Sequence, residues 1–190
     1  EVGGNVILFK NSLTSLKGLS HNIGGSLMIH YNKLTSLEGC PERINGDFLC
    51  SNNDLTSLEH CPTEINGDFS CDNNHLTSLI GSPIEVNSIS CGYNKLTDLK
   101  GCPSIVKGTI GAKKNSLTSL EGCPTEIGES IWVDQNKLTD LKYLPSCEYA
   151  ICDHNNITEL NFNNGDIKID EGISFKGNPI MALFDIDDKD

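Results

Sequence analysis

The sequence is poor in basic residues and contains no long apolar run. Only 14 Lys and Arg accompany 26 Asp and Glu, which gives a formal net charge of −12 at pH 7. This charge repels phosphate backbones and anionic lipid surfaces, so we expect neither a nucleic-acid partner nor a membrane partner. No apolar run approaches the roughly 18 residues that span a bilayer, and no leader-like segment opens the chain. The chain starts at Glu1, which leaves a removed leader open.

Aromatic residues are also scarce, at 6% of the chain, whereas Gly (18) and Pro (7) are frequent. This composition lacks the bulk of an ordinary compact core and indicates an internal repeat. The phrase Leu-Thr-Ser-Leu and its variants recur in steps of 19 to 21 residues, starting at Leu13, Leu34, Leu55, Leu76, Leu96, Leu117, Leu138 and Ile157. A period of this length predicts a solenoid, in which neighbouring units cover each other's apolar faces.

Two further columns align with the repeated phrase. An Asn lies two positions before its first residue in every unit, and the same column continues near the C-terminus: Asn11, Asn32, Asn53, Asn74, Asn94, Asn115, Asn136, Asn155 and Asn178. Three and five residues before each Asn lie apolar or small side chains, as in Phe48 and Cys50 before Asn53. That alternation predicts a short strand with one buried face. We expect the Asn amides to be buried and bonded to backbone groups of their own and adjacent coils.

The combined pattern in Phe48, Cys50, Asn53, Leu55 and Leu58 resembles the leucine-rich repeat, and the resemblance covers nearly the whole chain. It implies a β-rich, right-handed solenoid with one parallel sheet on its concave face. Gly-Cys-Pro phrases such as Gly39-Cys40-Pro41 follow the second Leu. They predict extended or polyproline-like convex arms with few or no α-helices, because Pro lacks an N–H and Gly is a poor helix former.

These short units are similar to the repeats of secreted bacterial effector proteins, and closer still to small repeat proteins with Cys-Pro phrases from bacteria and phages. No second domain follows the repeats, so the ligase activity of some effectors is not carried over. We expect about nine repeat units over residues 1–180. Residues 181–190 are expected to form a C-terminal cap, through Met181, Leu183 and Phe184, followed by an acidic tail.

Nine Cys could indicate a metal or disulfide framework. The repeat explains them better, because Cys50, Cys71 and Cys91 share a column with Leu8 and Ile29. We therefore expect buried packing groups, no metal site and no cofactor. The close Cys pair of a zinc knuckle is missing, and stacked thiols on parallel coils have poor disulfide geometry. Nine free thiols favour a reducing compartment, the cytoplasm.

Catalysis is not expected. The five His residues fall in different columns, and a nucleophilic Cys would need an exposed thiol of low pKa. Asp134 and Asp153 are predicted to lie on neighbouring strands of one face, which leaves a bridging calcium ion as a weaker alternative.

The outward side chains of the predicted sheet are not dictated by stacking, so they are free to recognise a partner. Two groups of exposed apolar and aromatic residues are of the kind that anchors protein interfaces, with Trp132 as the strongest candidate. The predicted partner-binding residues are Ile7, Phe9, Met28, His30, Tyr31, Leu49, Tyr93, Trp132, Asp134, Tyr149, Ile151 and His154.

These observations predict a non-enzymatic module that binds a protein through its concave sheet. The bacterial and phage resemblance implies that the partner is a host factor that the chain captures or blocks. The alternative is a structural spacer or oligomerisation module of a larger assembly. The chain begins almost inside its first unit, with Val2 in a core column, so a homodimer through an uncapped N-terminal end is also open.

Overall fold

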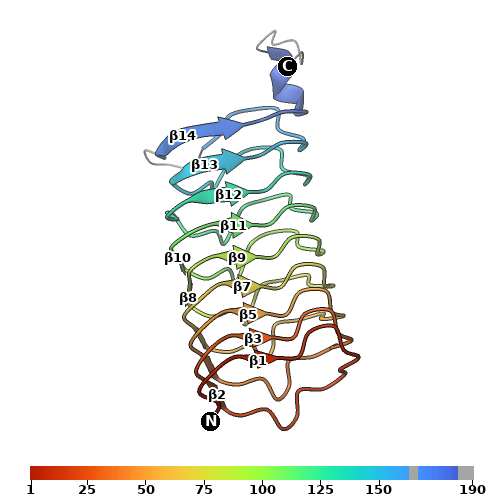
Figure 1. Cartoon of the computed structure of the whole chain (residues 1–190). Coiled ribbons are helices and arrows are strands. Elements are labelled where there is room, and N and C mark those ends of the chain that lie inside the picture. Colours follow the sequence, from red (N-terminus) through yellow and green to blue (C-terminus); the bar gives the residue numbers. More distant parts are fainter. Residues whose placement is uncertain (163–166, 184–190) are drawn as a thin grey trace.

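A computed structural model describes residues 1–162 and 167–183 as a stack of coils (Figure 1). Each coil contributes one short strand to a parallel, nine-stranded sheet, whose order is β1-β3-β5-β7-β9-β11-β12-β13-β14. The strands of this sheet are β1 (Val6–Ile7), β3 (Leu27–Met28), β5 (Phe48–Leu49), β7 (Phe69–Ser70), β9 (Ile89–Ser90), β11 (Ile110–Gly111), β12 (Ser130–Trp132), β13 (Cys147–Ile151) and β14 (Ile169–Ser174). The predicted solenoid with a parallel sheet is confirmed.

Strand pairing follows the sequence repeat. Leu27 pairs with Phe48, and Phe48 with Phe69, so equivalent positions of successive coils are neighbours. Each column of the sequence is therefore a row of stacked side chains. Among the described residues no α-helix occurs; the one helical element is the 3₁₀ helix η1 (Pro179–Leu183). No described helix has the length and apolar character needed to cross a membrane.

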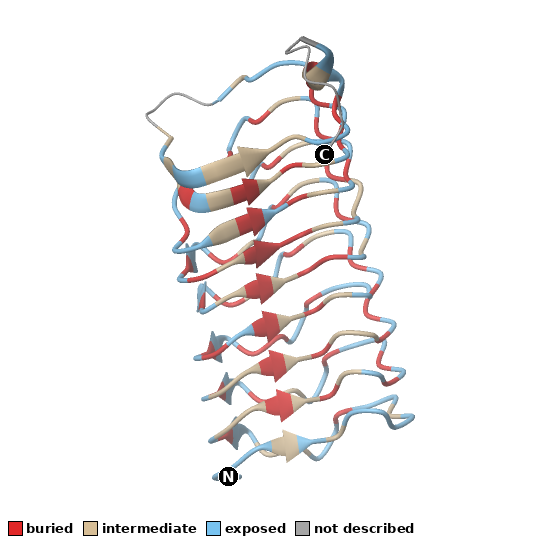
Figure 2. Cartoon of the chain, turned by 45° about the horizontal axis from the view of Figure 1, so that its top comes forward, coloured by how far each residue is buried: buried red, intermediate tan, exposed pale blue. Residues whose placement is uncertain are grey.

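The core lies between the sheet and the arms and contains the two Leu of each repeated phrase and the inward strand residues. Buried positions recur in the sheet strands from one coil to the next (Figure 2). Leu55, Leu58, Cys50 and Phe48 are all fully buried. The first coil differs: Val2, predicted in a core column, is 36% exposed. It does bridge to Ile23 in that column, but in the described structure only one neighbouring coil covers it.

The Asn column links adjacent coils through hydrogen bonds. Asn74 is buried; its Nδ2 donates to the carbonyl oxygens of Cys50 and Cys71 at 3.2 and 3.1 Å, and its Oδ1 accepts from the Leu55 N–H at 3.0 Å. Each such amide therefore satisfies backbone groups of two coils. Asn11 is an exception to the expected burial: it is exposed and donates only to its own coil.

The return arms contain more regular structure than predicted. Two additional parallel ladders lie there, one of β2 (Asn22–Ile23), β4 (Arg43–Ile44) and β6 (Glu64–Ile65), the other of β8 (Glu85–Val86) and β10 (Ile105–Val106). The one parallel sheet predicted for the concave face is present, and these short ladders add regular pairing to the extended arms. Val86 and Ile65 are buried in the same arm column, yet β6 and β8 are not joined in one ladder.

The 3₁₀ helix η1 follows the last coil of the described structure. Ile180 is buried and its N–H donates to the Ile157 carbonyl oxygen at 2.9 Å, which ties η1 to the preceding coil. The predicted contribution of Phe184 and the predicted acidic tail, residues 185–190, lie outside the described residues. The division of the chain at residue 180 stays a prediction.

Candidate protein-binding face

The sheet face consists of the outward side chains of the nine-stranded sheet and of the residues that follow each strand. At one end lie Ile7, Phe9, Met28, His30, Tyr31 and Leu49, which we call the N-terminal group. The structure brings them together: Ile7 pairs with Met28, and Met28 with Leu49. Phe9 stacks on His30 with ring centroids 4.7 Å apart, and Tyr31 meets His30 edge-on at 5.7 Å. Ile7 is 59% exposed.

His30 contributes an uncharged ring to this group. Burial lowers the pKa of His30, and the nearby Lys10 ammonium lowers it further. Its Nδ1 is buried and has no hydrogen-bond partner among the described residues. The imidazole is therefore neutral at pH 7 and extends the aromatic surface of Phe9.

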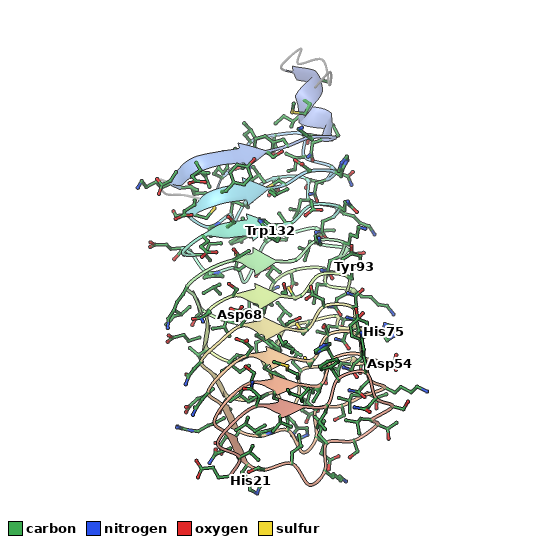
Figure 3. The ribbon with its side chains drawn as sticks, in the orientation of Figure 1. His21, Asp54, Asp68, His75, Tyr93 and Trp132 are labelled. Atoms are coloured by element: carbon green, nitrogen blue, oxygen red, sulfur yellow. The ribbon has the colours of Figure 1, made fainter. Side chains whose placement is uncertain are left out.

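At the other end of the sheet face lie Trp132, Tyr149, Ile151 and His154, which we call the C-terminal group. Trp132 lies on β12 (Figure 3). It pairs with Ile151 on β13. With His154 they line a hollow of about 350 Å³, whose other walls are Lys113, Asp134, Gln135 and Asp153. Tyr149 is half-buried and its ring lies next to Gly172. The hollow therefore contains three of the four residues of the C-terminal group, together with Asp134, which was also predicted to bind the partner.

A second hollow of about 310 Å³ lies on the middle coils and shares Lys113 and Trp132 with the first. We call these two adjoining hollows the central groove. Its middle part is lined by Ser51, Asn52, Asp72, Asn73, Ser90, Tyr93 and Gly111. Space exists there because Ser90 and Gly111 occupy the outward column that holds Met28 and Leu49 in earlier coils. Tyr93, predicted from its column, is 40% exposed.

Two carboxylates of the sheet face are engaged in internal hydrogen bonds. Asp72 accepts from Ser70 Oγ at 3.0 Å and from the Gly92 N–H at 2.8 Å. Asp153 accepts from Ser174 Oγ at 2.6 Å and from the Lys176 N–H at 2.8 Å. In the described part of the chain no group of three or more His, Cys, Asp and Glu has metal-binding geometry. The structure therefore gives the alternative of a calcium ion between Asp134 and Asp153 no support.

The nine thiols are unpaired, and six of them are buried. Burial raises the pKa of Cys40 and Cys102 to about 12, and that of Cys147 to about 11. For Cys71, complete burial raises the pKa well above its ordinary value. These thiols stay protonated near neutral pH, so they act as packing groups and are poor nucleophiles.

Two features of the surface escaped the sequence-based prediction. Lys113 and Lys114 flank Tyr93, with their Nζ atoms 5.9 and 4.8 Å from its ring centroid. On the arms, Ile84 is 72% exposed. It occupies a column that holds Glu42, Thr63 and Ser104 in other coils, so alignment of the arm columns would have revealed it.

Comparisons with known proteins yield solved structures of low sequence identity only. No family model matches the chain, and no curated protein matches it. The parallel sheet and the buried Asn column are the features that the leucine-rich repeat resemblance implies. The leucine-rich repeat domain of APL1B is similar at 15% identity and a TM-score of 0.48, covering 90% of this chain and 67% of that one. The functional domain of InlJ from Listeria monocytogenes, described as including a cysteine ladder, is similar at 16% identity and a TM-score of 0.33. That match covers 91% of this chain and 53% of the InlJ domain.

Proposed function

We propose that this chain is a non-enzymatic module that binds another protein through the sheet face. One observation carries the proposal: aromatic side chains, among them Trp132 at 42% exposure, flank a groove on the face that coil stacking leaves free. Desolvated Trp and Tyr residues beside well-shaped pockets are the usual anchors of protein interfaces. The bacterial and phage resemblance makes a captured or blocked host factor the proposed partner, and the buried free thiols favour a reducing compartment.

The first test uses the double variant Trp132→Ala, Met28→Glu, which changes one outward residue in each group. Both side chains point away from the core, so the Tm is expected to stay within about 3 °C of the wild type. The immobilised wild-type chain and the variant are used to capture proteins from the native cell, followed by quantitative mass spectrometry. A protein enriched by the wild type is then purified and titrated by calorimetry.

The matched control is Thr77→Ala, Thr97→Ala, which changes two exposed residues on the flank outside the sheet face. We expect the double variant at Trp132 and Met28 to lose the partner and the Thr control to retain it. Equal affinity of all three proteins for the partner would refute the sheet-face assignment.

A spacer or oligomerisation role is the second candidate. The first coil favours it, because Val2 and Ile7 are exposed and Val6 and Leu8 are only partly buried. Such a surface can be covered by another chain, including a second copy joined at β1. Light scattering separates the two roles: a stable dimer that Ile7→Glu dissociates supports oligomerisation, and a monomer at micromolar concentration excludes the homodimer.

A further inference from the structure

We infer that the central groove binds an extended acidic segment of the partner protein, with a carboxylate on Lys113 and Lys114 and an apolar or aromatic side chain beside Trp132. This inference rests on the proposed function and specifies the chemistry of the partner. Four observations support it: Lys113 and Lys114 have no ion-pair partner among the described residues, Tyr93 holds their ammonium groups near each other, the carboxylates are unevenly placed along the groove, and the groove has the length of an extended segment.

Positive charge is distributed unevenly between the arms and the sheet face. On the arms, Lys side chains pair with carboxylates of adjacent coils, as in Lys100 with Glu121 at 2.8 Å and Lys107 with Glu85 at 2.7 Å. Lys113 and Lys114 have no carboxylate within 4.0 Å among the described residues, although the net charge of the chain is −12. An anionic group that reaches the groove therefore meets two ammonium groups without ion-pair partners.

Tyr93 places these two ammonium groups near each other. Both Nζ atoms lie within 6 Å of the same ring, a distance at which a cation is attracted to the aromatic face. Lys114 follows Tyr93 in the next coil of the same column, and both residues have a left-handed backbone, with φ of 54° and 53°. The repeat geometry thus places the backbones of Tyr93 and Lys114 in equivalent positions of adjacent coils, and the contacts with the ring bring both ammonium groups together.

One carboxylate, Asp72, lines the same hollow as Lys113 and offsets part of this positive charge. Both carboxylate oxygens of Asp72 accept internal hydrogen bonds, one from Ser70 Oγ and the other from the Gly92 N–H. Its burial raises its pKa even though Lys113 opposes the shift. Asp134 lies in the part of the groove beyond Trp132, with Ile151 and His154. The Tyr93 side of the groove therefore has two ammonium groups against one carboxylate, whereas Asp134 and Asp153 line the other side. This distribution favours a segment whose acidic residue lies on the Tyr93 side.

The shape of the groove fits an extended chain. It runs from Ser51 after β5 to Ile151 on β13, a distance of about 24 Å at the usual strand spacing. About seven extended residues cover this length. The inner strands are paired on both sides, so the sheet offers few free backbone groups there. The groove therefore recognises the segment through side chains, by the charge of Lys113 and Lys114 and by the apolar surface of Trp132.

The test uses random peptides of about twelve residues displayed on phage, longer than the span of the groove. They are selected on the full chain and counter-selected on Trp132→Ala. Selected peptides are synthesised and titrated by fluorescence anisotropy at low and high salt. We expect Asp or Glu to be enriched near an aromatic or Leu residue, and affinity to fall as salt rises.

Lys113→Glu, Lys114→Glu is expected to weaken binding of these peptides by about tenfold or more. Its control, Lys17→Glu, Lys142→Glu, makes the same change in net charge on the exposed arms and is expected to leave affinity within about twofold. A second variant, Gly111→Met, fills the groove floor. Gly111 has no positive φ, and a Cβ there would approach only the Ser90 side chain, at 3.3 Å. Binding should fall while circular dichroism shows an intact fold.

The outcomes separate the inference from the proposed function. Peptides that require Trp132 but bind the Lys113, Lys114 variant as tightly as the wild type overturn the acidic-segment inference and leave the binding face in place. If no selected peptide depends on Trp132, both are overturned.

Discussion

At the scale of single residues, the turn that precedes each Cys-Pro phrase requires a left-handed backbone. Gly18, Gly39, Gly81, Gly101 and Gly122 adopt φ between 87° and 102° there, but His60 occupies the same column with φ of 65°. A side chain in this region costs about 1–2 kcal/mol, and Gly avoids that cost at some loss of chain entropy. We expect His60→Gly to raise the free energy of unfolding by about 0.5–1 kcal/mol, measured by urea denaturation.

Gly101→Ala is the matched opposite change. Its Cβ would overlap the backbone of Leu79 and Ile80 in the adjacent coil, in addition to the unfavourable φ of 87°. The free energy of unfolding should fall by about 2 kcal/mol or more. Equal stability of the two variants would contradict the importance of this backbone conformation.

Residue positions could be predicted well where the repeat dictates them. The alternation around Phe48 and Cys50 places both in the core, because a two-residue period has only one buried face. Contacts between outward side chains could not be predicted. The positions of Lys113 and Lys114 around Tyr93 depend on side-chain rotamers, and no sequence period encodes these.

At the scale of elements, the break between β6 and β8 has a measurable consequence. In the ladders on either side, arm amides donate to the preceding coil, for example Asn66 to Ile44 and Ile105 to Ile84. β8 itself lacks a ladder partner on its β6 side, although the following Asn87 N–H donates to the Gly67 carbonyl oxygen at 3.0 Å. A hollow of about 430 Å³ lies beside it. In hydrogen exchange with mass spectrometry, peptides that contain β8 should exchange faster than those with β4 or β6. Equal protection would show that the arm ladder is continuous in solution.

The arm ladders were missed because each of their strands has only two residues, too few to show alternation. The location of the break does have a sequence signal. Coil four has Asn87-Ser88 between its arm strand and its sheet strand, one residue fewer than Asn66-Gly67-Asp68 in coil three. The main sheet absorbs this deletion, since Phe69 still pairs with Ile89. The missing residue in coil four alone does not predict whether the main sheet or the arm ladder is interrupted.

For the whole molecule, the stacked thiols predict sensitivity to alkali. Burial raises the pKa of the thiols above the ordinary value of 9.0, for example to about 12 in Cys40 and about 11 in Cys147. The unfolded chain therefore loses thiol protons at lower pH than the folded chain does. The contribution of the protonated thiols to the free energy of unfolding should be fully present below pH 9. Above pH 9 the free energy of unfolding should fall, by up to about 1.4 kcal/mol per pH unit for each thiol.

Urea midpoints measured from pH 7 to 11 check this expectation. The variant Cys71→Ala, Cys91→Ala serves as the control: it is less stable at pH 7, because it leaves space in the core, but its midpoint should decline less steeply above pH 9. A wild-type midpoint that stays constant to pH 11 would contradict the assigned burial of the thiols.

The in-register stacking of the sheet has a consequence for how such a molecule can change over generations. Four strand steps separate β5, which carries Leu49, from β12, which carries Trp132, and each step adds about 4.8 Å. Duplication or loss of one unit between them would move the two anchors apart or together by that increment while leaving each intact. Changes in the number of units therefore give a series of distances between Leu49 and Trp132. A partner of altered size can then be accommodated by adding or removing units, without new contact residues.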